Sequence, residues 1–72
     1  MQELVVVFFE DEMVVVTETP NAVGFGMDEN GEVEIWLPKS QVHGTFEIGE
    51  WYEEVVIPRW LAEERDMEYT PA

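Results

Sequence analysis

Basic residues are scarce in this sequence of 72 residues: Lys and Arg together number 3, against 17 Asp and Glu. The formal net charge of −14 makes the surface repel nucleic acid and anionic membranes and attract basic proteins. Aromatic side chains such as Phe25, Trp36, Trp51 and Tyr52 are able to stack on single strands, but such binding also needs a positive groove that follows the phosphates. No direct binding of nucleic acid is therefore predicted.

Cysteine is absent, which excludes disulfides and thiolate metal sites and favours an intracellular protein. Long hydrophobic runs are also missing: the longest, residues 4–9, has six residues, whereas a membrane-spanning helix needs about 20. Residues 1–3 lack the basic start of a signal peptide. We expect one soluble, cytoplasmic domain over residues 1–72, with no membrane partner.

Residues suited to catalysis are few. Ser40 and His43 are the only Ser and His, and they lie three apart in a predicted loop with no strained turn or oxyanion hole to activate them. Residues 28–32 read Asp-Glu-Asn-Gly-Glu, but their glycine is fourth, whereas a calcium-binding EF-hand loop has glycine sixth and flanking helices. We predict a β-turn there, no metal or cofactor site, and no enzymatic activity.

The chain is nevertheless 46% hydrophobic, which separates it from acidic disordered tails. Val, Phe, Ile and Trp occur in runs of four to seven residues separated by acidic or glycine-containing breaks, a pattern typical of strands. Strands are predicted over residues 3–9, 13–19, 22–27, 32–37 and 51–57. The predicted fold is mainly β (α+β): a small, five-stranded, twisted antiparallel sheet or barrel with one short C-terminal helix.

Alternation sets the register of the third and fourth predicted strands. A three-residue loop over residues 29–31 puts their apolar faces in step, with the pairs Met27–Val33, Phe25–Ile35 and Val23–Leu37. Gly31 is expected in the left-handed conformation. Gly24 then lies across from Trp36, whose indole is able to cover a residue with no side chain.

Residues 4–9 and 13–16 are apolar at odd and even positions alike, and both faces of the hairpin that they are expected to form need cover. Glu10, Asp11 and Glu12 are its predicted turn. Either the sheet curls into a barrel and a subunit or partner covers the remaining face, or the hairpin is an exposed interaction edge. A homodimer through residues 4–9 is one form of this alternative.

A helix is predicted over residues 59–65, because Pro58 suits a first turn and good helix formers follow. Arg59 and Glu63 are four apart and able to pair. Trp60 and Leu61 are expected to pack on the sheet, and residues 67–72 to fray.

Two segments carry a resemblance: Ile35-Trp36-Leu37-Pro38-Lys39-Ser40-Gln41, and residues 55–65, which read VVIPRWLAEER. The chain resembles a family of short, functionally uncharacterised bacterial and phage-borne proteins with a Trp-Ile/Leu-Pro-Lys-Ser-Gln element and a Trp-Leu/Ile-Ala-Glu/Lys-rich end. The resemblance implies a genome context of phages and mobile elements and a compact β domain closed by a short helix. It implies no catalytic residues. Such proteins often end in Lys-Gly-Leu after the helix, whereas residues 65–68 here read Arg-Asp-Met-Glu, and this replacement of basic by acidic residues favours a charge-based inhibitory role.

These observations predict a DNA-mimic-like inhibitor that binds a basic, nucleic-acid-binding surface of another protein, such as a nucleic-acid-processing or defence enzyme. The carboxylates predicted to bind this partner are those of Glu10, Asp11, Glu12, Glu32, Glu34, Glu53 and Glu54. A second predicted site joins Trp36, Lys39 and Arg59. The alternative is a structural or assembly module that self-associates, or docks to a larger complex, through the apolar N-terminal hairpin.

Overall fold

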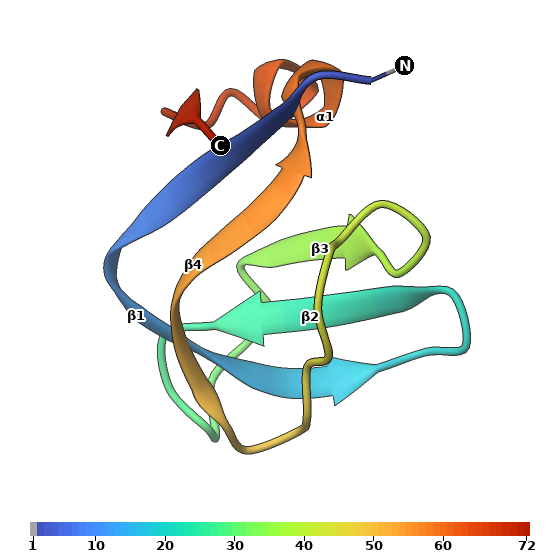
Figure 1. The fold of residues 1–72 in the computed structure, drawn as a ribbon. Coiled ribbons are helices and arrows are strands. Elements are labelled where there is room, and N and C mark those ends of the chain that lie inside the picture. Colours follow the sequence, from blue (N-terminus) through green and yellow to red (C-terminus); the bar gives the residue numbers. More distant parts are fainter. Residues whose placement is uncertain (1) are drawn as a thin grey trace.

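A computed structural model describes residues 2–72 and shows one antiparallel sheet with a short helix (Figure 1). The elements are β1 (Leu4–Glu18), β2 (Ala22–Gly26), β3 (Ile35–Pro38), β4 (Trp51–Pro58), α1 (Arg59–Glu64) and β5 (Thr70–Pro71). The strand order is β3-β2-β1-β4, and β5 also pairs with β1. The predicted five-stranded, mainly β architecture with one C-terminal helix is confirmed, as a sheet that does not close into a barrel within residues 2–72.

The predicted first hairpin is wrong, because residues 4–18 form one continuous strand. β1 stays paired with β4 on both sides of an irregularity between Phe8 and Met13, and its second half also pairs with β2. The three acidic residues between its halves include none of the Gly, Asn or Pro residues that tight hairpin turns require. The strand bends there instead of folding back, and Figure 1 shows the bend on the outside of the molecule.

The core lies on the concave side of this bent sheet. Its buried residues come from all the larger elements and from one loop: Val5, Val7, Val15, Val23, Phe25, Leu37, Val42, Val55, Ile57, Leu61 and Ala62. Phe25 is fully buried, with ring centroids of Phe9 and Phe46 each 5.5 Å away and that of Tyr52 6.3 Å away. Tilted and edge-to-face contacts of this kind stabilise aromatic clusters beyond simple area burial.

The predicted register of β2 and β3 is confirmed, with Val23 opposite Leu37, Phe25 opposite Ile35 and Gly24 opposite Trp36. The strands separate earlier than expected, however, so the predicted pair Met27–Val33 lies in the connection between them.

The turn in that connection is closed by Asp28. Its carbonyl oxygen accepts from the Gly31 N–H at 2.9 Å, and its carboxylate accepts from the Asn30 N–H at 2.9 Å. Within residues 2–72 only Gly44 and Gly49 have positive φ among the glycines, so the left-handed conformation predicted for Gly31 is wrong. The hydrogen bonds to Asp28 close this turn without a residue in the left-handed conformation.

The connection then folds back over the outer face of β2. A Cβ added to Gly24 would lie 2.9 Å from Val33 Cγ2 and 3.2 Å from Trp36 Cζ3, as expected for an indole that covers a glycine. A Cβ on Gly26 would lie 2.7 Å from the Glu32 carbonyl oxygen. The chain therefore supplies part of the cover that the second face of the sheet needs.

The helix begins after Pro58, as predicted, and the side chain of Leu61 on this helix is buried in the core. Trp60 is 45% exposed, so the prediction that it packs on the sheet is wrong: its position on the six-residue helix faces away from the core. The structure places Thr70 and Pro71 in β5, where they pair with Val6 and Val5, in the segment expected to fray.

Candidate functional site

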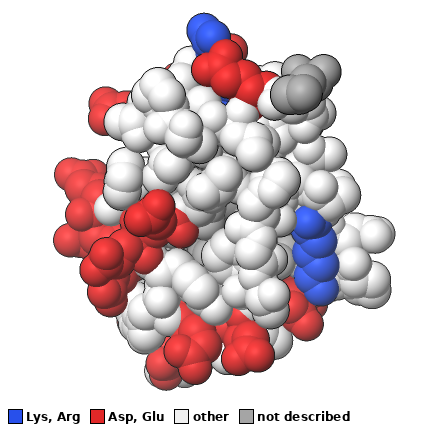
Figure 2. All heavy atoms as spheres, in the orientation of Figure 1, with Lys and Arg blue, Asp and Glu red and all other residues white. Residues whose placement is uncertain are grey.

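Five of the seven predicted partner-binding carboxylates belong to one corner of the sheet, where β1 bends against β4. We call the group Glu10, Asp11, Glu12, Glu53 and Glu54 the acidic bend; all five residues are exposed. Phe8 pairs with Glu54 and Met13 with Tyr52, which places Glu53 opposite the unpaired residues 9–12. Figure 2 shows acidic side chains gathered on the side of the molecule where β1 bends in Figure 1, and along the lower edge.

The acidic bend exists because both strands break their alternation at the same level. On β4, Tyr52 and Val55 both pack toward the core although they are three residues apart, which leaves the two residues between them exposed. On β1, Phe9 and Met13 pack toward the core, and strict alternation would turn Asp11 inward as well. The irregularity bends the strand, and the carboxylate of Asp11 stays in solvent.

No basic side chain neutralises the acidic bend in residues 2–72. Four ion pairs occupy all three basic residues of the chain elsewhere: Lys39–Glu18 at 3.4 Å, Arg59–Glu3 and Arg59–Glu63 at 3.2 Å each, and Arg65–Glu64 at 3.2 Å. These pairs are exposed and contribute little to stability. All three basic side chains therefore pair with acids outside the acidic bend.

Glu32 and Glu34 lie apart from the acidic bend. Both precede β3, which begins at Ile35, so the expected spacing of two carboxylates along one strand is not formed. The Glu34 N–H donates to the Phe25 carbonyl oxygen at 2.7 Å, which holds this segment beside β2. Glu34 thus lies on the edge of β2 away from β1, and Glu32 lies over the outer face of β2 beside Gly26.

The second predicted site, formed by Trp36, Lys39 and Arg59, is not assembled. Lys39 pairs with Glu18 at one end of β1 and Arg59 with Glu3 at the other end. Helix α1 contacts β1 and β4 but not β3, in the part of the chain that the structure describes. Trp36 and Arg59 are therefore on separate parts of the molecule.

Arg59 belongs instead to a polar cluster that fastens the C-terminal segment. Its Nε donates to the Tyr69 hydroxyl at 3.0 Å, and this hydroxyl donates to Glu63 Oε2 at 2.8 Å. Hydrogen bonds to Tyr69, Glu63 and Glu3 raise the pKa of Arg59. Hydrogen bonds lower the pKa of Glu63: the one from the Tyr69 hydroxyl contributes most, and the one from Arg59 is second.

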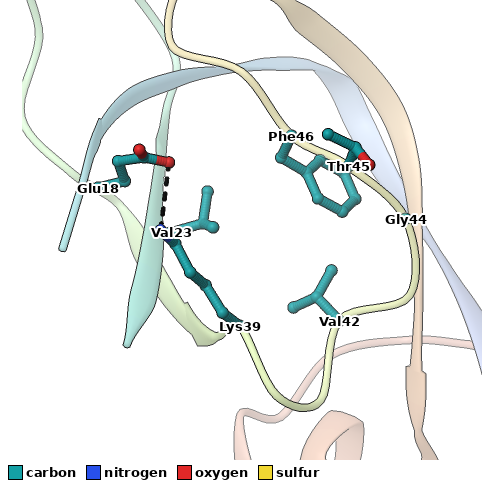
Figure 3. A pocket seen from close by; sticks show the side chains of 7 residues that line it. All are labelled: Glu18, Val23, Lys39, Val42, Gly44, Thr45 and Phe46. Atoms are coloured by element: carbon teal, nitrogen blue, oxygen red, sulfur yellow. Dashed lines mark ion pairs between the residues drawn. The ribbon is translucent and has the colours of Figure 1, made fainter. Parts of the chain in front are cut away.

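Sequence reasoning missed two hollows. The larger, of about 310 Å³, has Val23, Val42 and Phe46 on its walls and the Lys39–Glu18 ion pair at its rim (Figure 3). The smaller, of about 160 Å³, is lined by Phe8 and by residues 68–70 and lies beside the acidic bend. Phe8 is 57% exposed, whereas the aliphatic residues of β1 are buried or half-buried, and only the structure shows this difference.

Ser40 and His43 are not joined, and the acidic residues do not gather as metal ligands do, in the described part of the chain. No hydrogen bond joins Ser40 to His43 among the described residues, and the His43 N–H donates to the Val56 carbonyl oxygen at 3.0 Å. Residues 2–72 contain no group of three or more His, Asp and Glu placed to hold a metal ion.

No family model, curated protein or solved structure matches this chain. No helix in the described part of the chain has the length and apolar character needed to cross a membrane.

Proposed function

We propose that this chain is a non-enzymatic binding protein whose acidic bend docks on a basic surface of another protein and competes there with nucleic acid. One observation carries the proposal: five exposed carboxylates meet at one corner, while every Lys and Arg of the chain is paired elsewhere. Unneutralised charge of one sign steers a complementary partner and speeds its association.

The spacing of strand side chains supports competition with a polyanion. Residues two apart on a strand project about 7 Å apart, and neighbouring strands lie about 4.8 Å apart. Duplex DNA carries one phosphate charge about every 3.4 Å along each strand. Carboxylates on two adjacent strands therefore present charges at separations of the same order as a short phosphate array. The partner that fits is a protein that binds nucleic acid, such as a nucleic-acid-processing or defence enzyme.

A matched pair of variants tests the proposal. The bend variant carries Glu10→Gln, Asp11→Asn and Glu12→Gln; the control variant carries Glu29→Gln, Glu47→Gln and Asp66→Asn, three exposed loop acids without a basic partner in residues 2–72. Each removes three negative charges. Immobilised wild-type and control proteins are expected to retain a basic partner from lysate at low salt and release it to added duplex DNA, whereas the bend variant retains at least tenfold less. Equal retention by both variants would overturn the proposal.

The alternative proposal is self-association or docking through residues 4–9. This segment offers only a small exposed apolar surface. Val5 and Val7 are buried in the core, and Phe8 is the one large exposed hydrophobic of this segment. Sedimentation velocity separates the two functions. A concentration-dependent dimer that Phe8→Lys dissociates and that salt does not affect would favour assembly, and a monomer at all concentrations would favour the acidic bend.

A further inference from the structure

Strands β2 and β5 share one edge of β1. Val6 pairs with β4 and also with Thr70 of β5, so β5 lies on the edge of β1 opposite β4. Val14 pairs with β4 and also with Gly26 of β2, so β2 lies on that same opposite edge. Because each strand has only two edges, β5 and β2 flank a common gap.

The gap covers residues 7–13, which have no strand neighbour on this edge within residues 2–72. Seven residues span at most about 23 Å when fully extended, and the bend between Phe8 and Met13 shortens this length. Figure 1 shows this bent part of β1 on the outside of the molecule, with no ribbon beyond it. An edge of this length with free backbone groups is a template for an additional strand.

The side chains at the gap determine which kind of strand is able to pair with this edge of β1. Glu10, Asp11 and Glu12 lie within it, and the hollow between Phe8 and residues 68–70 lies at its β5 end. A second copy of this chain would bring the same three carboxylates against their like, which is unfavourable. A Lys/Arg-rich strand would instead place cations beside unneutralised carboxylates and an apolar or aliphatic side-chain stem against Phe8.

We propose that residues 7–13 of β1 accept an extended, Lys/Arg-rich segment of the partner protein as an added strand between β5 and β2. This inference rests on the proposed function and states how the acidic bend is used. Backbone hydrogen bonds supply affinity that depends little on sequence, and the carboxylates restrict the segment to basic ones. The hollow at Phe8 holds one side chain of the added strand and sets its position.

The test uses an eight-residue peptide of alternating Lys and Val and two N-methylated forms of it, one methylated at every Lys and one at every Val. Alternate N–H groups of a strand point to opposite edges, so one methylated form loses its hydrogen bonds to β1 and the other keeps them, with charge unchanged. Fluorescence anisotropy at low salt is expected to show at least tenfold weaker binding for one methylated form only. Amide hydrogen exchange within residues 7–13 is expected to slow at least tenfold when the unmodified peptide binds.

The outcomes separate this inference from the function on which it rests. Equal binding of all three peptides, or unchanged exchange in residues 7–13, would overturn strand addition and leave an acidic surface that binds by charge. Failure of all three peptides to bind would also overturn strand addition, while the comparison of the bend and control variants decides the proposed function independently. Loss of that difference as well would overturn both.

Discussion

The carbonyl oxygen of Glu32 lies where a side chain of Gly26 would be: a Cβ added to Gly26 would sit 2.7 Å from this oxygen. The same Cβ would lie 2.7 Å from Val16 Cγ2. Real Cβ atoms do not approach backbone oxygens so closely, so β2 and its returning connection require glycine at this position.

Gly26→Ala is therefore expected to destabilise the protein by about 2 to 3 kcal/mol, because the backbone at Glu32 must move to admit a methyl group. Gly24→Ala is the matched comparison, since its closest contacts are the side chains of Val33 and Trp36 and not the backbone. The Val33 side chain must still move, and we expect a smaller cost than for Gly26→Ala, of about 1 kcal/mol. Urea unfolding measures both, and equal losses would contradict this account of the Glu32 contact.

The register of β2 and β3 was predictable because it follows from local alternation and from the need to keep two apolar faces in step. The continuity of β1 was not. Three acidic residues between two apolar runs are compatible with either a hairpin turn or a bend, and the choice depends on pairing with β4, some 45 residues away in the sequence. Local pattern carries no information about such a distant partner.

The candidate site shows the same division. Glu10, Asp11 and Glu12 were predictable as exposed acids from their position between apolar runs. These three residues lie beside Glu53 and Glu54 because the pairing of β1 with β4 is irregular at this level. The sequence pattern does not predict this irregularity. The alternation of β3 continues back through Glu32 and Glu34 and predicts them on the strand, but these residues follow the turn closed by Asp28 and lie against β2 before β3 begins.

Phe25 is expected to be the most sensitive core position. It is fully buried and contacts the rings of Phe9, Phe46 and Tyr52, so Phe25→Ala should cost about 3 to 5 kcal/mol. A domain of this size has a total stability of about 4 to 11 kcal/mol, and this variant is expected to be largely unfolded by far-UV circular dichroism. Phe8→Ala, at an exposed aromatic of the same type, should change stability by about 0.5 kcal/mol or less, and a comparable loss there would contradict the assigned core.

Charge repulsion within the acidic bend is expected to oppose folding. At low salt the bend variant should be more stable than the wild type by about 1 kcal/mol, because like charges on neighbouring strand positions destabilise each other. Raising NaCl from about 0.05 M to about 0.5 M should stabilise the wild type and reduce the difference, since the Debye length then falls below the separation of these side chains. Urea midpoints at both salt concentrations measure the effect. A bend variant that is less stable than the wild type at low salt would show that the carboxylates make stabilising contacts instead.

The polar cluster at the C-terminal segment predicts a pH dependence of known sign. The pKa of Glu63 is lowered by the Tyr69 hydroxyl and by Arg59, so its contribution to stability is present above the ordinary Glu pKa of about 4.5 and is lost as pH falls through the lower folded-state value. Tyr69→Phe removes the hydroxyl that donates to Glu63 at 2.8 Å and should raise the pKa of Glu63 toward its ordinary value.

Carboxyl chemical shifts followed by NMR from pH 7 to about pH 2 would measure this pKa directly in both proteins. Glu68→Gln provides the control, because it removes a neighbouring acid that has no hydrogen bond to Arg59 or Glu63 among the described residues. The pKa of Glu63 should rise in Tyr69→Phe and change little in Glu68→Gln. Since Tyr69 also lines the hollow beside Phe8, an unchanged pKa in Tyr69→Phe would mean that this ring is not held in place by the cluster, and the hollow would lose its fixed wall.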